Sequence, residues 1–130
     1  LRLVAEGFEA ASIRVRGLQA EGQFGRELGR EADVMEAASI HFRSAANQTR
    51  FVVLRDQLAA GTPGPEVAAS LDKLLQDEEA LARALHAIQC RDSRIGFEAT
   101  NHYFYVPQDL AEKVLVCRDL RERWLRTTAH

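Results

Sequence analysis

The sequence predicts an all-α fold, an antiparallel bundle of about four helices with one long aromatic loop between the third and the fourth. Apolar residues recur at spacings of three and four through most of the chain, the period of amphipathic helices. Glycine and proline gather in residues 22–29 and 61–65 and mark turns between long helical segments. The only β-prone run, Tyr103–Val106, is too short and isolated to form a sheet.

Length and composition predict a single domain that spans residues 1–130. The chain is 46% apolar and 28% charged, the profile of a soluble globular protein. Its net charge is −2 and no basic face is evident, so neither a nucleic acid nor an anionic membrane is indicated as a partner. No apolar run approaches the roughly 18 residues of a membrane span.

The first helix is expected to end near Ala20–Glu21, where glycines follow. The second is expected from about Leu28 to Ala60, with apolar residues on several faces, which predicts contact with more than one neighbour. The stripe of the first helix is Val4, Phe8, Ala11, Val15 and Leu18. One stripe of the second is Leu28, Met35, Phe42, Thr49 and Val53.

The third helix is expected from Pro65 to near Asp92, and the fourth from Pro107 to a frayed end at residues 127–130. Proline suits the first turn of a helix because its missing N–H has no partner there. The acidic run Asp77–Glu79 predicts a solvated face. Both cysteines occupy apolar helical positions, which favours buried thiols over a disulfide and weakly favours a cytoplasmic location. The buried stripes are expected to hold Leu71, Leu74, Leu75, Leu81, Leu85 and Ile88, then Leu110, Val114, Cys117, Leu120 and Trp124.

The segment Asp92–Pro107 is the first candidate site, because it combines several aromatic rings with short polar side chains. It is either a packed structural loop, tied by an Arg94–Glu98 pair, or a surface for a sugar ring or a partner side chain. Acid–base chemistry by Glu98 and His102 is a weaker hypothesis. No metal-ligand spacing is present, and we assign no catalytic residue, metal or cofactor. The expected contact residues are Arg94, Glu98, Asn101, His102, Tyr103 and Tyr105.

A polar belt in the long helix is the second candidate site. Its residues recur at helical spacing and share neighbouring faces: His41, Arg43, Ser44, Asn47 and Gln48. Buried polar groups require hydrogen bonds, so one interpretation is a network that fixes helix register. The other is that the belt meets the aromatic loop or a neighbouring domain and completes a site. Because Ser44 lies mid-helix, it lacks the exposed elbow that serine nucleophiles commonly use.

Two segments, His41–Phe51 and Asp92–Tyr105, resemble the C-terminal helical region of large, poorly characterised bacterial proteins that are glycoside-hydrolase-like. The resemblance implies a non-catalytic accessory domain that packs on an upstream catalytic domain of the same chain or edges its sugar cleft. Carbohydrate would then be a ligand, although no residue here gains a catalytic role. The missing initial Met is consistent with a fragment of such a protein.

The alternative hypothesis is a helical scaffold or dimerisation module without a ligand. It predicts that the apolar stripe of the first helix stays uncovered within one chain and that a homodimer forms through it.

Overall fold

The fold is all-helical, as the sequence predicts. A computed structural model describes residues 1–19, 24–60, 65–96 and 106–128. These residues form four α-helices and no strand. The helices are α1 (Arg2–Gln19), α2 (Gly25–Ala59), α3 (Pro65–Arg91) and α4 (Pro107–Thr128).

The helix termini follow from local chemistry. Both Pro65 and Pro107 stand at the first helical position, as expected. Asp109 accepts a hydrogen bond from the backbone N–H of Val106 at 3.0 Å, which satisfies a donor at the start of α4. The second helix begins at Gly25 instead of near Leu28, with Glu27 in its first turn, where a carboxylate complements the positive end of the helix dipole.

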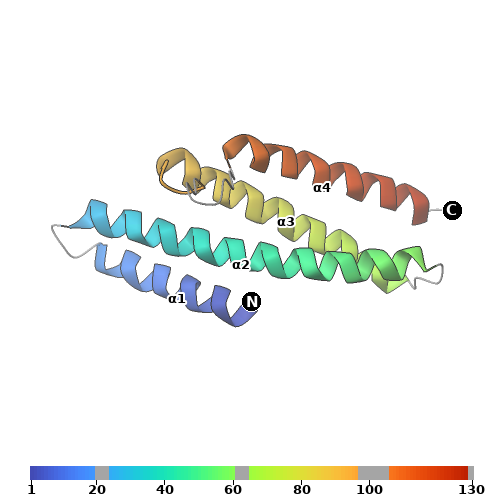
Figure 1. The fold of residues 1–130 in the computed structure, drawn as a ribbon, viewed down its shortest axis with the longest axis horizontal. Coiled ribbons are helices and arrows are strands. Elements are labelled where there is room, and N and C mark those ends of the chain that lie inside the picture. The colour runs from blue at the N-terminus through green and yellow to red at the C-terminus, as the bar shows by residue number, and fades with distance from the viewer. Residues whose placement is uncertain (20–23, 61–64, 97–105, 129–130) are drawn as a thin grey trace.

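The helices lie in a row. Figure 1 shows α2 as the longest helix, with α1 beside it on one side and α3 on the other, and α4 beyond α3. Within the described residues, backbone contacts join α1 to α2, α2 to α3 and α3 to α4, and no other pair of helices. An open row leaves one edge of α1 uncovered and leaves space between α2 and α4.

The core centres on α3, which supplies more of the buried residues than any other helix of the described chain. Leu71, Ile88 and Leu110 are the largest fully buried side chains. One cluster joins α2, α3 and α4: Ala37, Ile40, Ala82, Leu85, Ile88, Leu110 and Val114. A second cluster joins the other end of α2 to the start of α3: Leu54, Leu71 and Leu74.

The prediction that α2 contacts more than one neighbour is confirmed, since α1 and α3 both pack on it, but some of its apolar residues stay uncovered. The side chains of Val34, Val52 and Val53 are 42%, 45% and 53% exposed. The reason is the open row, in which α2 has only α1 and α3 as backbone neighbours.

Candidate functional site

The polar belt of α2 meets a carboxylate of α3. Ser44 Oγ donates a hydrogen bond to Glu78 Oε2 at 2.9 Å, and Asn47 Nδ2 donates to Glu78 Oε1 at 2.9 Å. Lys113 of α4 completes the cluster, with its Nζ 2.6 Å from Glu78 Oε2 and 2.8 Å from Ser44 Oγ. Only 5% of the Glu78 side chain and 20% of the Lys113 side chain are exposed. Three helices are therefore tied together at one buried ion pair.

The burial of Glu78 corrects the expectation that Asp77–Glu79 is a solvated face. Glu78 is 4% exposed, whereas Asp77 is exposed and pairs with Lys73 at 2.8 Å. Glu79 is partly buried and accepts hydrogen bonds from Arg83 and Arg118, which lower the pKa of its carboxyl group, the contribution of Arg118 being the larger. The physical reason is helical position, because Glu78 lies on the apolar stripe of α3.

Sequence reasoning missed Glu78 and Lys113 as functional candidates, although a signal for each was present. Glu78 lies four residues after Leu74 and four before Ala82, both of which are buried. Lys113 lies three residues after the fully buried Leu110. Side chains three and four apart share a helix face, so both positions point toward the core.

The other members of the belt have separate partners. Arg43 pairs with Glu9 of α1. Gln48 Nε2 lies 3.4 Å from Ser44 Oγ, a long hydrogen bond. His41 is exposed, and its ring makes an edge contact with Phe42 at a centroid distance of 5.7 Å. The belt therefore divides between the buried cluster, the α1 interface and the surface.

Arg94 is the one predicted contact residue of the aromatic loop that the structure describes. It forms a bidentate ion pair with Asp92, in which Nη2 lies 2.7 Å from Oδ2 and Nε lies 3.0 Å from Oδ1. Its Nη1 also lies 3.6 Å from Oε1 of Glu31. The Arg94 guanidinium holds the pKa of Asp92 well below its usual range. Outside the described residues lie the other predicted contacts and the predicted Arg94–Glu98 pair: Glu98, Asn101, His102, Tyr103 and Tyr105.

A second buried carboxylate, Asp33 of α2, joins the first three helices. Arg91 of α3 donates two hydrogen bonds to it at 2.9 and 2.8 Å, and Arg16 of α1 donates one at 2.6 Å. The hydrogen bonds from Arg91 and then Arg16 lower the pKa of Asp33 despite its burial. Arg16 also pairs with Glu36 at 2.5 Å.

The predicted stripe of α1 is only half covered. Phe8 stacks on Phe42 of α2 with ring centroids 5.9 Å apart, while Val4 and Leu18 remain 44% and 58% exposed. The charged residues Glu9 and Arg16 occupy the other edge of the α1–α2 contact. Helical spacing places the apolar stripes of the two helices next to each other at the Phe8–Phe42 stack. We call this surface the α1–α2 face: Val4, Phe8, Ala11, Val15, Leu18, Met35, Phe42 and Val53.

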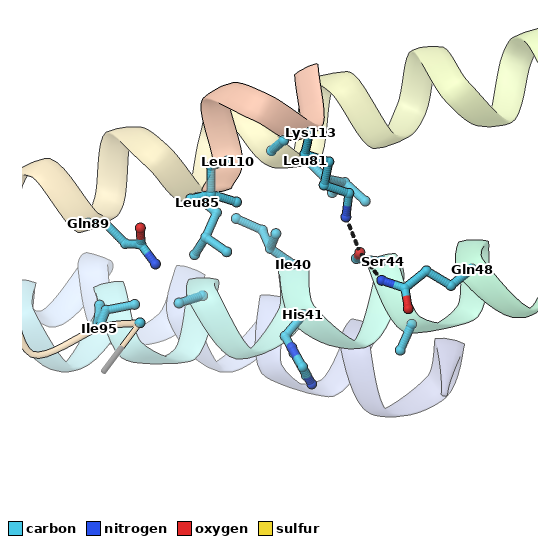
Figure 2. A pocket seen from close by; sticks show the side chains of 14 residues that line it. Ile40, His41, Ser44, Gln48, Leu81, Leu85, Gln89, Ile95, Leu110 and Lys113 are labelled. Atoms are coloured by element: carbon cyan, nitrogen blue, oxygen red, sulfur yellow. Dashed lines mark hydrogen bonds between the residues drawn. The ribbon is translucent and has the colours of Figure 1, made fainter. Parts of the chain in front are cut away.

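A cavity of about 330 Å³ lies between α2 on one side and α3 and α4 on the other (Figure 2). Its polar end contains Ser44, Gln48 and Lys113. Gly96 lines its other end with a φ of 93°, a left-handed conformation that favours glycine. The apolar lining includes Ile40, Leu81, Leu85, Ile95 and Leu110.

The two cysteines differ in exposure. Cys117 is buried, and its burial raises the pKa of its thiol, with a further rise from the nearby Glu78. Cys90 is an exposed free thiol, so the expectation that both are buried is wrong for Cys90. Its Sγ lies 3.7 Å from Nδ1 of His86, one turn earlier on α3.

Among the described residues, no cluster of three or more histidine, cysteine or carboxylate side chains has the arrangement of a metal site. None of the described helices is long and apolar enough to cross a membrane. Comparisons with protein-family models, with characterised proteins and with solved structures found no match.

Proposed function

We propose that this chain is a helical assembly module that pairs with a second copy of itself through the α1–α2 face. The observation that carries the proposal is the exposure of Val4 and Leu18 on the apolar stripe of α1 and of Val53 on the apolar stripe of α2. Full burial of a leucine or valine side chain contributes about 1.5–3 kcal/mol, so an exposed group of them favours a protein contact.

The eight residues that define this face are all uncharged, which favours a second copy as the partner. Two identical charged surfaces repel each other, whereas two identical apolar surfaces pack together without a need for complementary charge. Two-fold symmetric pairs of this kind are the commonest form of soluble homo-oligomer. The charges on the opposite edge of the α1–α2 contact, Glu9 and Arg16, have partners within the chain.

The predicted antiparallel order of helices is part of this proposal. Glu9 pairs with Arg43, and Arg16 with Glu36, so rising residue numbers in α1 meet falling numbers in α2. This order supports a hairpin of α1 and α2 that presents both apolar stripes on the same side. A symmetric pair would then bury the two hairpins against each other as a four-helix layer.

Sedimentation equilibrium tests the proposal. The chain is expected to pass from monomer to dimer as its concentration rises from micromolar to submillimolar. Leu18→Glu is expected to weaken the dimer at least tenfold, because it places a charge in an apolar contact. Ile13→Glu is the matched control, since Ile13 is 66% exposed on the same helix but lies away from the face.

Two outcomes contradict the proposal. A chain that stays monomeric throughout the concentration range has no self-association to explain. If Leu18→Glu and Ile13→Glu weakened the dimer equally, the dimer would depend on the hydrophobicity of the whole surface and not on the α1–α2 face.

We also propose, on the resemblance of residues 41–51 and 92–105, an accessory role in a carbohydrate-active protein. In that role the aromatic loop contacts a catalytic domain or edges its sugar cleft. Asp92, held by Arg94 and by Arg30 at 3.6 Å, gives the loop a fixed starting point, which supports a defined contact.

Calorimetric titration of the chain with neutral oligosaccharides tests the accessory role. Binding is expected, with a loss of at least fivefold in affinity for Tyr103→Ala and for His102→Ala. Val52→Ala, a change at a 45% exposed residue near the opposite end of α2, is expected to leave binding unchanged. If the chain bound no oligosaccharide, or if all variants bound it equally, the aromatic loop would not be a sugar-binding surface.

A further inference from the structure

The cavity between α2 and α4 is a feature that the assembly proposal does not use. The backbones of α2 and α4 make no contact within the described residues, because both helices pack on α3. The long side chain of Lys113 spans the space and reaches Ser44 across it. The cavity therefore results from the placement of the helices. Its volume of about 330 Å³ falls within the usual range for small-ligand pockets.

The walls of the cavity favour an apolar occupant. Figure 2 shows Ile40, Leu85 and Leu110 gathered in its middle, between the polar end and Gln89 on the opposite side. The ring of His41 points away from this group. Water gains few hydrogen bonds along such a lining, and apolar cavities are readily filled by apolar molecules.

The polar end of the cavity is electrically balanced. The ammonium group of Lys113 is paired with the Glu78 carboxylate, which also accepts hydrogen bonds from Ser44 and Asn47. An anionic head group at this end would approach Glu78, and a cationic one would approach Lys113. Either charge would also have to lose its hydration. An uncharged group avoids both costs, and the amide of Gln48 can both donate to it and accept from it, whereas Ser44 already donates to Glu78 and accepts from Lys113.

We propose that this cavity binds a small uncharged amphiphile, with its aliphatic body along Ile40, Leu85 and Leu110 and a hydroxyl head beside Ser44 and Gln48. At the roughly 30 Å³ that one water molecule takes in the liquid, the space accommodates about eleven non-hydrogen atoms. That size corresponds to a medium-chain alcohol or a compact alicyclic alcohol.

The test compares three probes that share one chain and differ in head group: 1-octanol, octanoate and octylammonium. Binding to the full chain is followed by amide chemical shifts in a two-dimensional NMR titration. The amides of Ser44, Ala45 and Leu85 are expected to shift with 1-octanol, with an affinity at least tenfold higher than for either charged probe. No shift with 1-octanol, or equal affinity for all three probes, overturns the proposal.

A cavity-filling variant locates the site. Ala45→Leu places additional carbon atoms in the cavity and is expected to weaken 1-octanol binding at least tenfold, with the helical circular dichroism unchanged. Ala84→Leu, the same substitution at an exposed position of α3 that does not line the cavity, is the control. Binding that survives in Ala45→Leu, or falls equally in both variants, contradicts this location. Because the cavity and the α1–α2 face involve different residues, Leu18→Glu is expected to leave 1-octanol binding intact.

Discussion

Replacing Glu78 with alanine is expected to lower the free energy of unfolding by about 3–5 kcal/mol, the cost of breaking a buried ion pair from one side. The Lys113 ammonium would lose the carboxylate 2.6 Å away, and Ser44 and Asn47 would lose their shared acceptor. Because these groups come from α2 and α4, the loss affects three helices together. Urea unfolding at neutral pH, followed by circular dichroism, measures the effect.

Asp77→Ala is the matched control for Glu78→Ala. Asp77 is the preceding residue, and its exposed pair with Lys73 at 2.8 Å is expected to contribute less than about 1 kcal/mol. The double variant Glu78→Leu with Lys113→Met is expected to be more stable than Glu78→Ala, because it removes both charges and keeps the volume. If Glu78→Ala destabilised the fold no more than Asp77→Ala, the buried cluster would not hold the helices together.

Glu78 also shows where reasoning from the sequence succeeds and where it fails. The stripe of α3 correctly predicted buried residues, among them Leu71, Leu85 and Ile88, because burial on one helix follows its period. Glu78 lies on that same stripe, but the acidic run was interpreted from its composition alone. Position on the helix face decides burial more strongly than the character of the neighbouring residues.

Sequence patterns predicted the residues that α2 contributes to the candidate site, but not those that come from the other helices. One of the two interpretations of the α2 belt was a hydrogen-bonded network, and Ser44 and Asn47 do bond within one. Their partners Glu78 and Lys113 come from other helices, whose register depends on packing of the whole fold. The pair between Arg91 and Asp33, 58 residues apart, was unpredictable for the same reason.

The open row of helices could not be predicted from the stripes either. Apolar residues on several faces of α2 are typical both of a helix inside a closed bundle and of one with an exposed docking surface. The two cases differ in whether α1 and α4 come together, which depends on the turns and not on the stripes. The uncovered stripe and the cavity both result from that one feature of the arrangement.

Acidification is expected to destabilise the fold by a few kcal/mol between neutral pH and about pH 3, with Asp33 as a principal contributor. Arginine partners lower the pKa values of Asp33, Asp72 and Asp92 in the folded state, so the folded chain binds fewer protons than the unfolded chain. The stability is fully present above the unfolded pKa of about 4. It is lost as the pH falls through the lower pKa values of the folded state.

Asp33→Asn isolates the contribution of Asp33 to this pH dependence. At neutral pH the variant is expected to lose about 2 kcal/mol, since hydrogen bonds to a charged group contribute about 1.5–3 kcal/mol each and those from Arg16 and Arg91 are partly solvated. The difference from the parent chain is expected to shrink as the pH falls below about 4, where Asp33 of the unfolded parent takes up a proton, and to be lost once the pH passes the lowered pKa of Asp33 in the folded state. Urea unfolding at a series of pH values measures it, with Asp56→Asn, a change at a 62% exposed side chain, as the control. A difference that stays constant from neutral to acidic pH would mean that Asp33 acts through packing and not through its charge.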